Sequence, residues 1–153
     1  MVQPIPDNYP RVSPYLRVDG AAAAIDFYTS VFGFTERGRM PSPDGRLGHA
    51  ELELGDSLVM LADEFPEMGQ VGPQKIGGSP VTISVYVEDV DAVVAKAVDA
   101  GATLTVPVDD QFYGDRLGVV QDPFGHVWSV ASHIEDVSPE EMERRAAEAM
   151  GGG

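Results

Sequence analysis

The chain has 153 residues, 43% of them hydrophobic, which is enough for one domain with a buried core. It carries 25 acidic against 10 basic side chains, for a net charge of −15, and it has no cysteine. This charge repels phosphate backbones and anionic lipid, so neither nucleic acid nor a membrane is an expected partner. The lack of thiols excludes disulfides and thiolate metal sites. No apolar run reaches the roughly 20 residues of a membrane helix and no signal-peptide pattern is present, so we expect a cytoplasmic location.

A weak internal repeat with a period of about 70 residues sets the expected architecture. Leu47-Gly48 recurs as Leu117-Gly118, and Gly55 recurs as Gly125. Each copy predicts a strand, a helix and then three strands. The expected fold class is therefore α+β, with two βαβββ modules that form curved mixed sheets around a cavity.

The first module is predicted over residues 11–64. It starts with a strand over 12–18, and Asp19 is the expected N-cap of the following helix. That helix has an apolar stripe at helical spacing and ends at Gly33. Three strands follow, over residues 35–40, 47–54 and 57–62. The stripe consists of Ile25, Tyr28, Val31 and Phe32.

The second module is predicted over residues 81–133. A strand over 81–87 leads to a helix capped by Asp89 and stopped by Gly101. Strands over 102–107, 117–121 and 126–132 complete it, and Asp122-Pro-Phe-Gly125 forms the last turn. The residues of this helix that are expected to face inward are Val90, Val93, Val94, Ala97 and Val98.

Residues 65–80 are rich in Gly and Pro and form the expected linker, while a C-terminal helix is predicted over 138–150. Ser138-Pro-Glu-Glu141 is a capping box with Pro at the first helical position. The apolar stripe of this C-terminal helix is thin, which indicates that the helix is peripheral or contacts a partner. Whether the modules pair within one chain or exchange between two chains stays open.

Several phrases carry a resemblance to a known family: Leu16-Arg-Val18, Ile25-Asp-Phe-Tyr28, Phe32-Gly33 and Asp122-Pro-Phe-Gly125-His-Val-Trp128. Over residues 11–145 the chain resembles a single domain of the vicinal-oxygen-chelate (glyoxalase, bleomycin resistance protein, dioxygenase) superfamily. It is most similar to the PhnB-like branch. The resemblance implies a homodimer and a role in lyase, isomerase or dioxygenase chemistry or in drug sequestration.

The same resemblance predicts that no metal is bound. Metal-dependent members hold a divalent ion on four side chains, and the matching positions here are Ser13, Met60, Thr82 and Ser129. Hydroxyl and thioether groups are poor ligands for such ions compared with imidazole or carboxylate. We therefore expect no metal and no other cofactor.

Strand alternation predicts which side chains face the cavity. His49 and Glu51 lie two apart on one strand face and form a candidate proton-transfer pair. Alternatively they belong to a solvent-facing strand edge or to a relocated metal site. The expected substrate-binding residues are Ser13, Tyr15, Met60, Thr82, Ser84, Tyr86, Arg116 and Ser129.

The segment before Leu117 is expected to be irregular, with Arg116 reaching the cavity mouth to bind an anionic group. The alternative is that Arg116 pairs with Asp115 or Asp122. Phe112 and Tyr113 are candidates for an aromatic lid, and His133 for a hydrogen-bonded hinge.

The favoured function is metal-independent binding of a small molecule, with sequestration of a drug or metabolite as one use. An acidic protein suits a cationic ligand, although the acidic surface equally serves solubility. One alternative is an enzyme that uses His49 and Glu51 or a relocated metal site. The other is a non-catalytic structural dimer.

Overall fold

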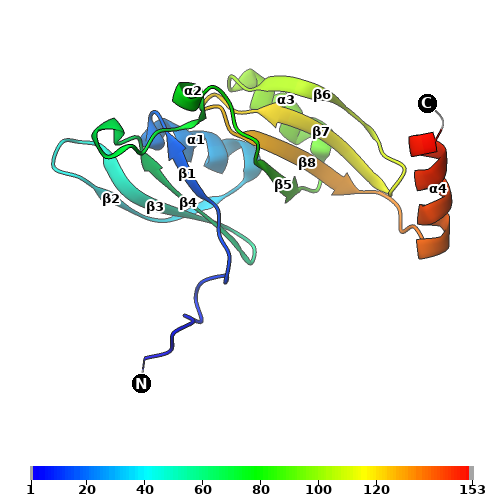
Figure 1. Ribbon diagram of the computed structural model, residues 1–153, viewed down its shortest axis with the longest axis horizontal. Helices are drawn as coiled ribbons and strands as arrows, with labels where there is room; N and C mark the ends of the chain where they lie inside the picture. Colours follow the sequence, from blue (N-terminus) through cyan, green and yellow to red (C-terminus); the bar gives the residue numbers. More distant parts are fainter. Residues whose placement is uncertain (1, 152–153) are drawn as a thin grey trace. The chain divides into compact units, whose positions relative to one another are not determined.

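The computed structural model describes residues 2–151, and the chain divides into two compact units, one ending at Ser79 and the other beginning at Pro80. The elements of the first unit are β1 (Tyr15–Val18), α1 (Ala21–Phe32), β2 (Thr35–Pro41), β3 (Leu47–Leu54) and β4 (Ser57–Asp63). The elements of the second are β5 (Thr82–Tyr86), α3 (Val90–Asp99), β6 (Thr103–Asp110), β7 (Asp115–Gln121), β8 (Val127–His133) and α4 (Pro139–Gly151). A 3₁₀ turn, η1 (Pro66–Met68), and the short helix α2 (Pro73–Ile76) follow β4. Figure 1 thus shows the predicted βαβββ order twice, an α+β fold.

Each unit contains one four-stranded mixed sheet. The strand orders are β1-β4-β3-β2 and β5-β8-β7-β6, with the first strand of each unit parallel to the last and the other pairs antiparallel. Tyr15 lies opposite Met60, and Ser84 lies opposite Ser129, so partner residues have the same separation along the chain in both units. The internal repeat therefore extends to the register of the sheets.

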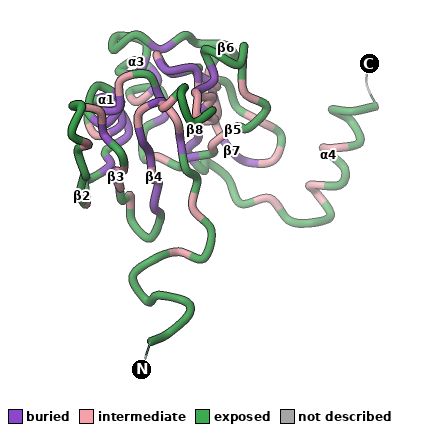
Figure 2. Tube along the Cα trace, turned by 60° about the vertical axis from the view of Figure 1, so that its left-hand side comes forward, coloured by how far each residue is buried: buried purple, intermediate pink, exposed green. Residues whose placement is uncertain are grey.

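One face of each sheet is buried under its helix, and the other face is more open. In the first unit α1 packs on its sheet and contributes the predicted stripe, all four of whose residues are buried. Figure 2 shows buried stretches on α1 and β4. Alternation along the strands predicts nine apolar residues that face the helices. Ile83 and Val87 are half-buried, and the other seven are buried: Leu16, Val18, Val59, Leu61, Val85, Trp128 and Val130. Period-two alternation of the strands therefore separates a core face from a polar face in both units.

The prediction that Asp19 caps the first helix is wrong. The N-cap is Gly20, with φ at 105°, and glycine has no side chain that could cap the helix. Asp63, at the end of β4, accepts instead from the backbone N–H groups of Gly20 at 3.1 Å and Ala21 at 2.7 Å. Its second carboxylate oxygen accepts from the Leu47 N–H at 2.7 Å. One carboxylate thus joins the start of α1 to two strands.

The second helix follows its prediction more closely. Asp89 is the N-cap, and its Oδ1 accepts from the Ala92 N–H at 3.1 Å. Val90, Val94 and Ala97 are buried, but the expectation that Val98 faces inward is wrong, since it is 43% exposed.

Three strands differ in extent from their predictions, and one of them, β6, continues to Asp110 instead of ending at residue 107. The first begins at Tyr15 rather than at residue 12, because Pro14 has no N–H to donate; its carbonyl still accepts from the Met60 N–H at 2.9 Å. Ser13 therefore precedes the strand. The segment before Leu117 is not irregular: β7 starts at Asp115, and Arg116 pairs with Asp110 in the antiparallel ladder.

The C-terminal helix α4 begins with the predicted capping interaction, in which the Glu141 N–H donates to Ser138 Oγ at 3.2 Å. None of its residues is buried. Arg145 ties the helix to the preceding chain through Glu135 and the Phe112 carbonyl. Among residues 2–151, no helix has the length and apolar character needed to cross a membrane.

Candidate functional site

The open face of the first sheet carries a continuous chain of hydrogen bonds. Tyr15 Oη lies 2.8 Å from His49 Nδ1, and His49 Nε2 lies 2.9 Å from Glu51 Oε2. The sheet register explains the proximity, because Met60 on β4 lies opposite Tyr15 on one side and opposite Glu51 on the other. The proposed pairing of His49 with Glu51 is thus present as a direct contact, with Tyr15 added to it.

Two residues that the sequence analysis did not identify complete this cluster. The hydroxyl of Tyr9 donates to both oxygens of Glu51 at 3.0 Å, and Arg37 Nε lies 3.6 Å from Glu51 Oε1. The guanidinium of Arg37 also lies 4.4 Å from the centroid of the Tyr9 ring, a cation–π distance. Only the folded chain brings residue 9 onto β3, so no local pattern could have identified it.

The hydrogen bond from His49 lowers the pKa of Glu51, and the Tyr9 hydroxyl and the Arg37 charge act in the same direction against partial burial. Glu51 is therefore ionised at neutral pH. The hydrogen bond between Tyr9 and Glu51 raises the pKa of Tyr9, because the neighbouring carboxylate disfavours a phenolate.

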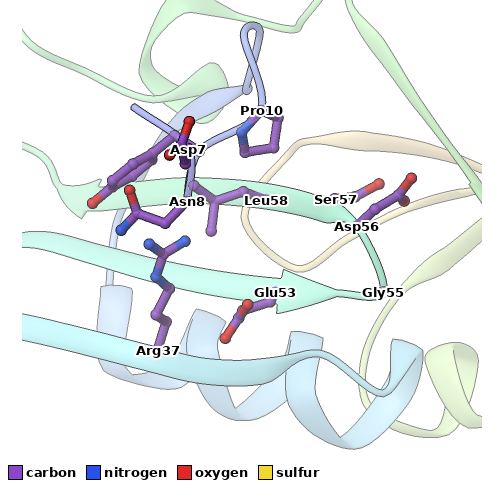
Figure 3. A pocket seen from close by; sticks show the side chains of 10 residues that line it. Asp7, Asn8, Pro10, Arg37, Glu53, Gly55, Asp56, Ser57 and Leu58 are labelled. Atoms are coloured by element: carbon purple, nitrogen blue, oxygen red, sulfur yellow. The ribbon is translucent and has the colours of Figure 1, made fainter. Parts of the chain in front are cut away.

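A pocket of about 350 Å³ lies between the N-terminal segment and the sheet of the first unit. Figure 3 shows Arg37 and Glu53 extending from β2 and β3 below residues of the N-terminal segment. Leu58 lines this pocket together with Tyr9 and Pro10 and is only 3% exposed. Residues of the N-terminal segment thus lie over an apolar side chain on the open face of the sheet.

The second unit has a pocket of about 280 Å³ on the open face of its sheet. Three of the predicted binding residues, Ser84, Tyr86 and Ser129, line it. Tyr113, one of the two candidate lid residues, lines it as well and forms an edge-to-face pair with Phe112 at 5.2 Å. The other lining residues are Val85, Asp115, Leu117 and Ala131.

Asp115 is the charged group of this pocket. It is buried, its Oδ2 accepts from the Tyr86 hydroxyl at 2.6 Å, and its Oδ1 lies 2.9 Å from His133 Nδ1. Burial opposes ionisation of Asp115, but the hydrogen bonds from Tyr86 and His133 outweigh it and lower its pKa. An ionised carboxylate therefore stands in the wall of an aromatic and hydroxyl-lined pocket.

His133 bridges two carboxylates, since its Nε2 also lies 2.8 Å from Asp136 Oδ1. Both neighbours accept hydrogen bonds, so the imidazolium, which donates from both nitrogens, suits the position best. Asp115 and then Asp136 accordingly raise the pKa of His133. The expected hinge is thus a charged link between β8 and the chain that follows it.

Arg116 does not take either of its expected roles. It lies outside the lining of the second-unit pocket, and it pairs with neither Asp115 nor Asp122. Its guanidinium binds Asp91 on α3 and Asp110 on β6, each at 2.9 Å. Strand alternation explains the difference, because Asp115 and Leu117 point to the open face and Arg116 to the face that carries α3.

Three of the other predicted binding residues are placed as follows. Met60 is half-buried between Tyr15 and Glu51 in the sheet. Ser13 precedes β1, Thr82 is the first residue of β5, and both lie outside the two pockets.

The chain consists of two modules, each with the element order βαβββ and one mixed sheet covered by a helix. This arrangement defines a paired-module class of α+β proteins. The chain belongs to the Glyoxalase/Bleomycin resistance protein/Dioxygenase superfamily, whose family model matches residues 10–130. It is 47% identical over 137 residues to protein Rv0887c of Mycobacterium tuberculosis, an alignment that covers 88% of this chain and 81% of that protein.

Two solved structures share the fold of this chain. The X-ray structure of the Arabidopsis thaliana At5g48480 product is 32% identical, covers 80% of this chain and 98% of that one, and gives a TM-score of 0.62. A PhnB protein from Bacillus cereus shares the fold with a TM-score of 0.65 at 17% identity, over 80% of this chain and 99% of that one.

The side chains at the positions that the resemblance matches to the metal ligands of this family do not fit a divalent transition metal. Ser13 and Met60 occupy them in the first unit, and Thr82 and Ser129 in the second. Within residues 2–151, His, Asp and Glu side chains form no group of three or more suited to hold an ion. The relocated site considered for His49 and Glu51 would have only two such ligands, whereas protein sites usually supply three or four.

Proposed function

We propose that this protein binds a small organic molecule without a metal ion, and that the second-unit pocket is a binding site. The observation that carries the proposal is the buried carboxylate of Asp115, which is hydrogen-bonded to Tyr86 and His133 in a pocket that also presents Tyr113 and Ser129. Ligand sites typically combine apolar and aromatic walls with a few placed polar groups.

The chemistry of the pocket favours a ligand with a cationic group. Asp115 accepts one hydrogen bond on each oxygen, and a carboxylate has further lone pairs for an ammonium or amidinium. A charge-assisted hydrogen bond in a partly desolvated pocket is stronger than one in water. Tyrosine rings beside the carboxylate add cation–π attraction. Sequestration of a basic drug or metabolite is the use we propose for this site.

A thermal-shift screen with basic antibiotics, polyamines and small carbonyl compounds tests the proposal. A ligand at 100 times its dissociation constant adds about 2.7 kcal/mol to the free energy of unfolding, a readily measured shift in Tm. We expect hits among the basic compounds, with D115N weakening them by roughly 10- to 100-fold, the loss of one charge-assisted hydrogen bond. D99N, which removes the same charge from the exposed end of α3, should leave binding intact.

Equal binding to wild type and D115N would contradict this site, and no hit in any class would favour the non-catalytic structural dimer. Metal analysis of untagged protein should find no stoichiometric ion after soaking with Zn²⁺, Ni²⁺, Fe²⁺ or Mn²⁺. One tightly held ion would overturn metal-independent binding.

Two finer assignments are part of the same proposal. We place the protein in the PhnB-like branch, supported by the segment from Asp122 to Trp128 and by the fold shared with the Bacillus cereus PhnB protein. We also propose a homodimer, as is common in the superfamily. Sedimentation at several concentrations tests it, and a monomer at every concentration would refute it.

A further inference from the structure

The hydrogen bonds around His49 have a direction. Glu51 is an ionised acceptor, so a neutral His49 carries its proton on Nε2 and donates it to Glu51. The lone pair of Nδ1 then accepts from the hydroxyl of Tyr15, which lies 2.8 Å away. Tyr15, His49 and Glu51 therefore form an ordered donor chain in which a base lies directly behind the tyrosine hydroxyl.

The carboxylate end of the chain is held firmly, whereas the tyrosine end is accessible. Glu51 has contacts from His49, Tyr9 and Arg37, and its side chain is only 13% exposed. Tyr15 retains 42% of its surface on the open face. A base supported by an orienting carboxylate and a reactive group open to a ligand is the arrangement that general acid–base catalysis requires.

We propose that Tyr15 is the proton-exchanging group of an acid–base site in the first unit, with His49 and Glu51 as its relay, and that its substrates are small oxo acids with an acidic C–H next to the carbonyl. This activity is separate from ligand binding in the second-unit pocket.

The step balances without a co-reactant. The tyrosine oxygen takes the proton from the substrate carbon, the C–H bond breaks and its electron pair forms the enolate. At the same time the original hydroxyl proton moves to His49 Nδ1, and the imidazolium is stabilised by Glu51. Reversal returns a proton to carbon, so the reaction by itself is enolisation and, for a suitable substrate, isomerisation.

The positive charge of Arg17 beside Tyr15 is the reason for proposing a substrate that carries a carboxylate. The guanidinium carbon of Arg17 lies 5.2 Å from the centroid of the Tyr15 ring. Arginine stays protonated at all relevant pH values, so it favours both a substrate carboxylate and the negative charge that develops on the enolate.

Deuterium incorporation into the methyl group of pyruvate, followed by proton NMR in D₂O, tests the activity directly. The wild-type protein should accelerate the exchange above the buffer rate. Y15F should lose about 100-fold, within the range of one general acid–base group, and H49Q and E51Q at least about tenfold. D26N, which changes an exposed carboxylate on α1 in the same unit, should exchange at the wild-type rate.

Nitrogen NMR of the His49 ring tests the direction of the hydrogen bonds that the relay requires. We expect the Nε2–H tautomer in wild type, identified by the signal lost in H49Q, and a mixture of tautomers in E51Q. Melting temperatures of all variants verify the fold. Exchange at the buffer rate by wild type, full activity in Y15F or an Nδ1–H tautomer would each overturn the proposal.

Discussion

At the scale of single residues, charge placement decides how this protein responds to pH. Asp115 and Asp136 both accept from His133, and they raise its pKa above the ordinary 6.5. The folded state therefore stabilises the charged form of His133 more than the unfolded chain does. The stabilisation is fully present below about pH 6.5 and is lost as pH rises through the raised value.

We accordingly expect H133Q to unfold at lower denaturant concentration than wild type at pH 6 and to approach wild type at pH 9. Urea unfolding across this range measures the difference. D136N, which removes one of the two acceptors, should show the same trend with a smaller amplitude. A gap between H133Q and wild type that widens toward high pH would contradict the assignment.

At the scale of elements, the two equivalent helices start in different ways. Asp89 caps α3 with its own side chain, whereas α1 relies on Asp63, a residue at the far end of β4. The position of Asp19 before α1 looks equivalent to that of Asp89 before α3, yet Asp19 is exposed and does not cap the helix.

We expect D89A to lower the free energy of unfolding by about 1 kcal/mol, the usual cost of losing an N-cap. D19A should change it by less than about 0.5 kcal/mol, as for most exposed positions. Guanidinium unfolding of both variants provides the comparison. An equal loss in D19A and D89A would mean that Asp19 contributes to the helix after all.

At the scale of the whole molecule, the net charge of −15 opposes compaction. Salt shortens the screening length to about 8 Å at physiological ionic strength, which weakens repulsion between surface carboxylates. We expect Tm at pH 7 to rise by a few degrees as NaCl increases from low to physiological concentration. Replacing the exposed Glu140 and Glu143 by lysine should reduce this dependence. A Tm that falls with salt would show that ion pairs outweigh the repulsion.

Features that depend on residues close together in the sequence could be predicted from it. Alternation along the strands predicted the buried faces, and it placed His49 beside Glu51 and put Tyr86 and Ser129 on the open face of the second sheet. Helix stripes, Gly33 and the Asp89 cap were also readable, because each depends on residues only a few positions apart.

What the sequence by itself determined is therefore local: the order of the elements, which face of each strand is apolar and which positions lack metal-binding side chains. The tertiary structure alone decided which distant groups meet: Tyr9 and Arg37 at Glu51, Asp63 at the start of α1, and Arg116 with Asp91 instead of in a pocket. Such contacts depend on register between strands and on the path of connecting segments. These are properties of the packed chain as a whole, and no short window of sequence encodes them.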